Sequence, residues 1–224
     1  MKSGGLTKLQ ALTESYSNYN IDYNQFTDEA CYNQTAIFSV ISVKNPDVQL
    51  SLARFLVDSL HLDPNYLDSN SQTVLYYAAR DGCYLLAAYL IIDCHSDVNH
   101  RDRICGQSPL FYAARFGQFE LIRLLSTRGA DLDLRDNKED TAIYYAISNG
   151  KLKALELIVE LGAKVDIKSK KGESPLSLAE RHYQRPMISI IKNALADKLS
   201  SDEEEHKPEK RGKQKGKPGR KPSK

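Results

Sequence analysis

A short segment recurs four times at a nearly constant interval, and this periodicity restricts the fold more than any other feature of the chain. The copies are Thr73–Ala79, Ser108–Ala114, Thr141–Ile147 and Ser174–Ala179, and their first hydroxyl residues are 35, 33 and 33 residues apart. A degenerate copy, Thr35–Val40, begins 38 residues before Thr73. Regular spacing of this kind predicts one supersecondary unit that stacks on copies of itself.

Each unit has the features of two short helices joined by a turn. The leading Ser or Thr is expected to cap the first helix by accepting a hydrogen bond from a free helix N–H. Pro109 and Pro175 then occupy the first helical position, where a missing N–H costs nothing. Gly82, Gly117 and Gly150 follow at one offset and are expected to end this helix with a positive φ. An amphipathic second helix follows, for example over Phe119–Leu125.

These features together resemble the ankyrin repeat, whose pattern is a turn, a T-P-L-H-x-A-A helix, a second helix and a G-A-D-V-N exit with a period of 33. The resemblance implies an all-α fold: an ankyrin-repeat solenoid of stacked helix-turn-helix units with short β-turn or hairpin tips. We place repeats at about 68–101, 102–135, 136–168 and 169–196, after a diverged repeat at about 30–67. The predicted domains are an N-terminal cap or loosely ordered segment (1–29), the repeat domain (30–199) and a disordered tail (200–224).

Aromatic residues replace the family's His after the Pro-Leu pair. They are Tyr76, Phe111 and Tyr144, with Ser177 in the last unit, and Tyr77, Tyr112 and Tyr145 follow at the next position. Two interpretations are open: the rings form core packing between repeats, or they form an exposed strip on the concave face that grips a peptide.

One junction between repeats is irregular. The exit Gly is missing from residues 93–99, and the turn at Asp102–Gly106 is one residue longer than its neighbours. We expect an irregular, functional turn there.

The tail has a composition unlike that of the repeats. After about Leu199 it contains almost no apolar residues, which predicts disorder. An acidic run, Asp202–Glu205, precedes residues 206–224, which contain nine basic residues and one acidic residue. This basic arm fits a nuclear import signal, a weak nucleic-acid contact or a merely solubilising tail. Pro218–Pro222 resembles an AT-hook core, although Lys221 interrupts it. The tail residues that we single out are Lys210, Arg211, Lys213, Lys215, Lys217, Arg220 and Lys221.

Ser200 and Ser201 each have an acidic residue three positions later. This spacing resembles the target of an acidophilic kinase, and phosphorylation there would add negative charge beside the basic arm.

No arrangement of residues indicates catalysis. Gly-rich phosphate loops, H-E-x-x-H and G-x-S-x-G motifs do not occur. Cys83, Cys94, His95, His100 and Cys105 match no common zinc spacing, so we expect no metal and no cofactor. We also expect no small-molecule substrate. The sequence has neither a membrane-length apolar run nor a secretory signal, and four cysteines are few, which favours the cytoplasm or nucleus.

The resemblance implies a protein-binding surface at the tips and at the two positions before each helix-ending Gly. The candidate residues are Arg80, Asp81, Ile104, Arg115, Phe116, Asn137, Lys138, Ser148, Asn149, Lys170, Lys171 and Arg181. Basic residues gather near the later tips, which favours a partner with an acidic segment. The prediction is a non-enzymatic nuclear adaptor whose partner is a protein such as a chromatin-complex subunit. The alternatives are a cytoplasmic adaptor or enzyme inhibitor, and a histone-tail reader that uses the aromatic strip.

Overall fold

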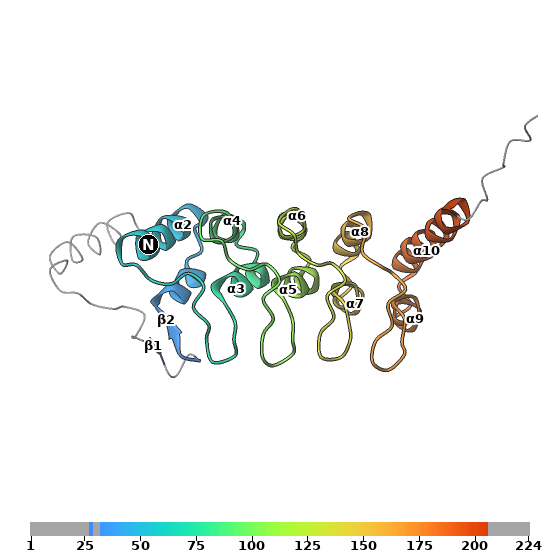
Figure 1. Ribbon diagram of the computed structural model, residues 1–224, viewed down its shortest axis with the longest axis horizontal. Coiled ribbons are helices and arrows are strands. Elements are labelled where there is room, and N and C mark those ends of the chain that lie inside the picture. Colours follow the sequence, from blue (N-terminus) through green and yellow to red (C-terminus); the bar gives the residue numbers. More distant parts are fainter. Residues whose placement is uncertain (1–26, 29–31, 206–224) are drawn as a thin grey trace, which may run out of the picture.

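The computed structural model describes residues 27–28 and 32–205, and it shows a row of helix pairs (Figure 1). Helices α3, α5, α7 and α9 form one layer, α2, α4, α6, α8 and α10 form the other, and the tips project from the first layer. Each helix contacts its partner in the same unit and its equivalent in the next unit. The elements are β1 (Thr27–Asp28), β2 (Gln34–Thr35), η3 (Ala36–Ser42), α2 (Pro46–Arg54), η4 (Phe55–Ser59), α3 (Val74–Asp81), α4 (Tyr84–Ile92), α5 (Pro109–Phe116), α6 (Phe119–Thr127), α7 (Ala142–Ser148), α8 (Leu152–Glu160), α9 (Pro175–Arg181) and α10 (Arg185–Glu205).

The first unit keeps the plan of the others in altered form. Strands β1 and β2 pair antiparallel at its tip, with Thr27 opposite Thr35. A 3₁₀ helix, η3, replaces the first α-helix, and the second helix, α2, continues into the π-helical turn η4. This unit lies in the range predicted for the diverged repeat, except that β1 falls in the predicted N-terminal cap (1–29). The remainder of that cap lies outside the described residues.

The predicted hydroxyl caps form in only one of the four clear repeats. Ser174 accepts a hydrogen bond from the Ser177 N–H at 3.1 Å. In the other three units the prediction is wrong, because Thr73, Ser108 and Thr141 are buried and their side chains make no capping bond. Their backbone carbonyls accept the helix N–H instead, for example from Phe111 to Ser108 at 3.0 Å. The hydroxyl residue is thus a small buried residue at the start of the helix rather than a capping group.

Left-handed backbone conformations recur within three residues after each helix from α3 to α9. Gly82 and Gly117 end α3 and α5 with φ of 79° and 77°, as predicted. A Cβ on Gly82 would lie 2.7 Å from Oε1 of Gln118 in the next repeat, so a larger residue there would displace this flexible side chain. The positive φ is therefore the stronger reason for a glycine. At the irregular junction, His95 has a φ of 54° where the next unit has Gly129 at 87°. A histidine therefore replaces the exit glycine at this junction, and the left-handed backbone conformation is kept.

The first aromatic position belongs to the core. Tyr76, Phe111 and Tyr144 are 5%, 1% and 3% exposed. At this position the core interpretation is therefore correct, and the strip does not extend to it.

Helix α10 is longer than the other described helices. It continues to Glu205, so residues 200–205 are helical where composition predicts disorder. Three of the four residues in the acidic run are glutamates, which are good helix formers, and the run extends a helix that the repeat packing has already begun. Ser200 and Ser201 lie in this extension, and the basic arm at 206–224 lies outside the described residues. None of the described helices combines the length and apolar character needed to cross a membrane.

Candidate protein-binding surface

A buried aspartate organises each of three tips, as Asp136 illustrates. Its Oδ1 atom accepts hydrogen bonds from the backbone N–H groups of Lys138 (2.8 Å) and Asp140 (3.1 Å). Its Oδ2 atom accepts from the Tyr145 hydroxyl (2.6 Å) and the Gln107 amide (3.0 Å). Asp68 and Asp102 hold the equivalent turns. The Asp136 carboxylate therefore fixes the tip backbone and, through Tyr145, links it to α7, a helix of the layer from which the tips project.

Backbone hydrogen bonds connect neighbouring tips into one continuous edge. The N–H of Arg103 donates to Asn70 O (2.9 Å), and the N–H of Asn137 donates to Cys105 O (2.9 Å). The N–H of Lys170 donates to Lys138 O at 2.8 Å. Side chains from consecutive tips are consequently held at fixed spacing, as a rigid binding surface requires.

The second aromatic position lines the inner face but is engaged within the chain. Tyr77, Tyr112 and Tyr145 are half-buried. The hydroxyl of Tyr77 donates to Asp68 as that of Tyr145 does to Asp136. Burial and this hydrogen bond to Asp136 raise the pKa of Tyr145 well above its usual value.

Two predicted binding residues pack on these rings. The guanidinium group of Arg80 lies 5.0 Å from the Tyr77 ring centre and pairs with Asp81. The guanidinium group of Arg115 lies 4.9 Å from the Tyr112 ring centre and 4.5 Å from that of Tyr145. Such contacts stabilise the inner face, so Arg80, Asp81 and Arg115 already have partners in this surface.

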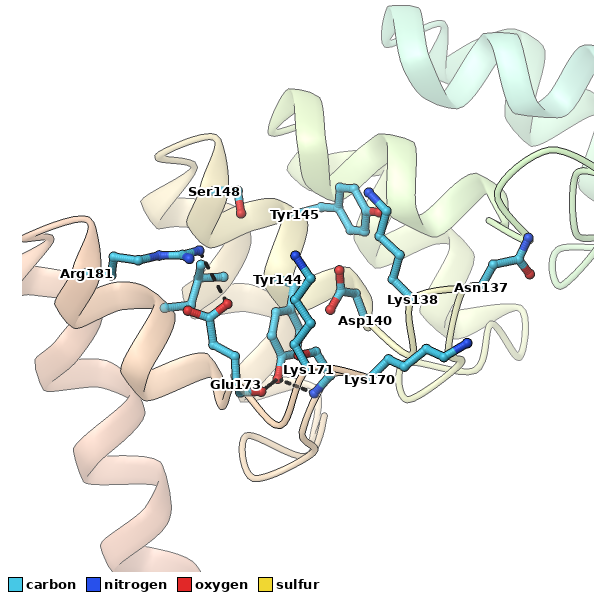
Figure 2. A pocket seen from close by; sticks show the side chains of 12 residues that line it. Asn137, Lys138, Asp140, Tyr144, Tyr145, Ser148, Lys170, Lys171, Glu173 and Arg181 are labelled. Carbon is cyan, nitrogen blue, oxygen red and sulfur yellow. Dashed lines mark hydrogen bonds and ion pairs between the residues drawn. The ribbon is translucent and has the colours of Figure 1, made fainter.

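A hollow of about 410 Å³ lies between the last two tips and helices α7 and α9 (Figure 2). Figure 2 shows Lys138, Lys171 and Arg181 extending around it above Tyr144 and Asp140. Six predicted residues line it: Asn137, Lys138, Ser148, Lys170, Lys171 and Arg181. The other six predicted residues do not: Arg80, Asp81, Ile104, Arg115, Phe116 and Asn149 lie outside it. The hollow thus brings together the C-terminal half of the predicted surface.

The other lining residues are Asp140, Tyr144, Tyr145, Ser169, Glu173 and Leu178. Tyr144 and Tyr145 were considered as members of the aromatic strip, whereas sequence reasoning missed the other four as binding residues. Asp140 and Glu173 are each the fourth residue after the first residue of a tip, Asp136 and Ser169, and their backbones close the tip turns. This recurring offset was a signal in the sequence that could have placed both carboxylates at the hollow.

The hollow contains more positive than negative charge. Arg181 pairs with Glu173 at 3.3 Å, whereas Lys138, Lys170 and Lys171 form no ion pair within the described part of the chain. Burial is the main cause, and the nearby Asp136 carboxylate the second, that raise the pKa of Asp140 to about 6. The positive charges of Lys138 and Lys171 act in the opposite direction. An anionic group entering the hollow would meet three lysines that form no ion pair within the described residues, two of which, Lys138 and Lys171, also interact with the Asp140 carboxylate at longer range.

Asp140→Asn is expected to stabilise the protein at pH 7.5 and to have little effect at pH 4. The raised pKa means that the folded wild type binds the Asp140 proton more tightly than the unfolded state does. The stability that this proton gives the wild type is present below about pH 4 and is lost as the pH rises through about 6. The variant has no such loss, so it is the more stable protein at pH 7.5. Solvent screening limits the gain to roughly 1 kcal/mol or less. Urea denaturation of both proteins at the two pH values measures it. An equal difference at both pH values would contradict the assignment.

Two of the five residues considered as metal ligands, Cys83 and His100, have hydrogen-bonding contacts within the chain. The Gln49 amide donates to Sγ of Cys83 (3.3 Å), and Nε2 of His100 lies 2.8 Å from Ser71 O. Within residues 27–28 and 32–205, no three His, Cys, Asp or Glu side chains are grouped to hold a metal ion.

Comparison with known proteins agrees with this geometry. Residues 85–169 match the family model for ankyrin repeats (3 copies). The chain is also similar to the E3 ubiquitin-protein ligase hecd-1 of Caenorhabditis elegans, with 37% identity over 87 residues, 39% of this chain. That match spans 3% of the length of hecd-1. Residues 85–169 are therefore ankyrin repeats, and such repeats form a protein–protein interaction module of a generally non-enzymatic kind.

Proposed function

We propose that this protein is a non-enzymatic adaptor that binds an acidic segment of a partner protein in the hollow between the last two tips. The observation that carries this proposal is the set of three lysines, Lys138, Lys170 and Lys171, that form no ion pair within the described residues and lie on tips joined by backbone hydrogen bonds. Complementary charge increases association rate and selects partners by sign.

The arrangement of aromatic residues favours this ligand over a histone tail. One ring position is buried, and at the other the hydroxyls of Tyr77 and Tyr145 are bonded to aspartates, so little free aromatic surface remains to surround a cation. A lysine-rich tail would also meet the lysines of the hollow. A histone-tail reader is thus the weaker proposal.

The nuclear part of the proposal depends on the basic arm at 206–224, which has nine basic residues. This arm would supply import and a weak, salt-dependent nucleic-acid contact, and a chromatin-complex subunit is the proposed kind of partner. Residues 200–224 fused to a fluorescent reporter should accumulate in nuclei. A cytoplasmic signal would favour the alternative, a cytoplasmic adaptor or enzyme inhibitor.

Lys138→Glu combined with Lys171→Glu is expected to weaken binding of a fluorescein-labelled Glu/Asp-rich peptide by at least about tenfold. Each reversal replaces an attraction with a repulsion at the hollow. Fluorescence anisotropy at low and physiological salt measures the affinity. The matched control, Lys44→Glu with Lys153→Glu, changes net charge equally at exposed positions away from the hollow. Equal weakening by both variants would mean that net charge, and not the hollow, attracts the peptide.

A further inference from the structure

The outward face of helix α4 is apolar, in contrast to the same face of every neighbouring outer helix. Helix α4, Tyr84–Ile92, contains no charged or strongly polar residue apart from its tyrosine hydroxyls. Its positions Leu85, Ala88 and Ile92 form one stripe at helical spacing. A helix that is apolar all round is ordinarily buried on all sides, and α4 is not.

The repeat itself supplies the comparison that makes this stripe informative. The equivalent exposed positions carry polar residues in the other units: Ser51, Arg54 and Asp58 in the first, Glu120, Arg123 and Thr127 in α6, and Lys153, Glu156 and Glu160 in α8. All nine are exposed. The solenoid therefore does not need apolar side chains at these positions, and folding alone does not account for the stripe.

The stripe is accessible and of limited size. Leu85 and Ile92 of the stripe are 37% and 43% exposed. Outside the stripe, Tyr84, which begins α4, and Phe119, which begins α6, are each 45% exposed. Together these side chains present on the order of 300 Å² of apolar surface, the size at which exposed patches are often functional. A stable dimer of two copies needs roughly 800 Å² from each partner, so this surface is too small for that occupant.

The length and flanks of the stripe indicate what it fits. Leu85 to Ile92 spans about two helical turns, roughly 10 Å. Each flank offers one base and one acid. On one side Arg54 and Asp58 are equivalent to Ala88 and Ile92, and the Tyr89 hydroxyl is bonded to Asp58. On the other side Glu120 and Arg123 of α6 are equivalent to Leu85 and Ala88, so the two acids lie toward opposite ends of the stripe. A short helix with apolar residues on one side and charges of both signs beside them would complement all of these features.

We propose that the outward face of α4 is a second docking site, which receives a two-turn amphipathic helix of a partner protein. The site lies on the layer opposite the tips, so it can be occupied together with the hollow on the inner face. It does not depend on the acidic ligand proposed for that hollow.

The test uses the full chain and a fluorescein-labelled peptide of about 14 residues, with leucines at i, i+3, i+4 and i+7 and Glu and Lys elsewhere. Anisotropy measures binding, and amide shifts in NMR spectra locate it. Saturable binding with shifts in α4 is expected, and a scrambled peptide of the same composition should bind at least tenfold more weakly. Unsaturable binding, or shifts elsewhere, would overturn the proposal.

The decisive variant gives α4 the residues that α6 already carries: Leu85→Glu, Ala88→Arg and Ile92→Thr. Because the fold accommodates these residues at equivalent positions, the variant should keep its circular dichroism spectrum and lose at least tenfold in peptide affinity. The control, Lys153→Glu with Glu156→Lys on α8, should bind within twofold of the wild type. Equal affinity of the α4 variant would refute the site. A concentration-dependent dimer that the α4 variant abolishes would replace the partner helix with a second copy.

Discussion

Asp136→Ala is expected to lower the free energy of unfolding by about 3–5 kcal/mol, because it removes the acceptor of four hydrogen bonds from a buried site. The donors left behind are two backbone N–H groups of the tip, the Tyr145 hydroxyl and the Gln107 amide. Loss of Asp136 also releases the tip that carries Lys138, so peptide binding at the hollow should fall with stability.

Urea denaturation followed by circular dichroism measures this effect. Asp166→Ala is the control, since Asp166 is exposed and its ion pair with Lys198 lies on the surface. Surface pairs of this kind contribute up to about 1 kcal/mol. If the two variants lose similar stability, the tip aspartate does not have the structural role described for it.

Phe111→Ala is expected to destabilise the protein by about 3–5 kcal/mol, the usual cost of deleting a buried aromatic ring. The ring is almost fully enclosed and meets Tyr145 of the next unit edge-on at 5.6 Å between ring centres. The cavity would therefore open at an interface between two repeats, where a solenoid obtains much of its cooperativity.

Phe116→Ala separates this core role from a binding role. Phe116 is the exposed aromatic residue at the end of the same helix, α5, so its removal should leave the denaturation midpoint nearly unchanged. Should Phe111→Ala instead leave stability intact and alter only peptide binding, the ring would belong to a recognition strip and the core assignment would fail.

The sequence predicted the stacked helix pairs because their signals are local and repeated. Gly82 and Gly117 mark helix ends through a backbone conformation that few other residues adopt, and the Ala pairs mark close helix contacts. The hydroxyl caps were mispredicted at Thr73, Ser108 and Thr141 because capping preference does not say whether a side chain will be buried between repeats.

The binding surface was predicted less completely, because it depends on contacts between units. A position before a helix-ending glycine can bind a partner or pack on its own chain, and Arg115 packs on two tyrosine rings. Asp140 and Glu173 recur at one offset in their tips, but the packing of two tips was needed to show that both line the same hollow. The repeats were found by the residues that they share, and such a search passes over positions at which one repeat differs from the others. Comparing equivalent outward positions of the second helices would have shown that α4 alone is apolar there among the repeats compared.

The central claim is that the partner binds at the lysines of the hollow, and affinity capture with the full chain tests it most directly. The baits are the wild type, the Lys138→Glu/Lys171→Glu variant, its Lys44→Glu/Lys153→Glu control, and the chain without residues 206–224, with captured proteins quantified by mass spectrometry. We expect a protein with an acidic segment that the wild type, the control and the tail deletion retain and the hollow variant loses at least tenfold. A partner that the hollow variant retains as well as the wild type does would contradict the claim.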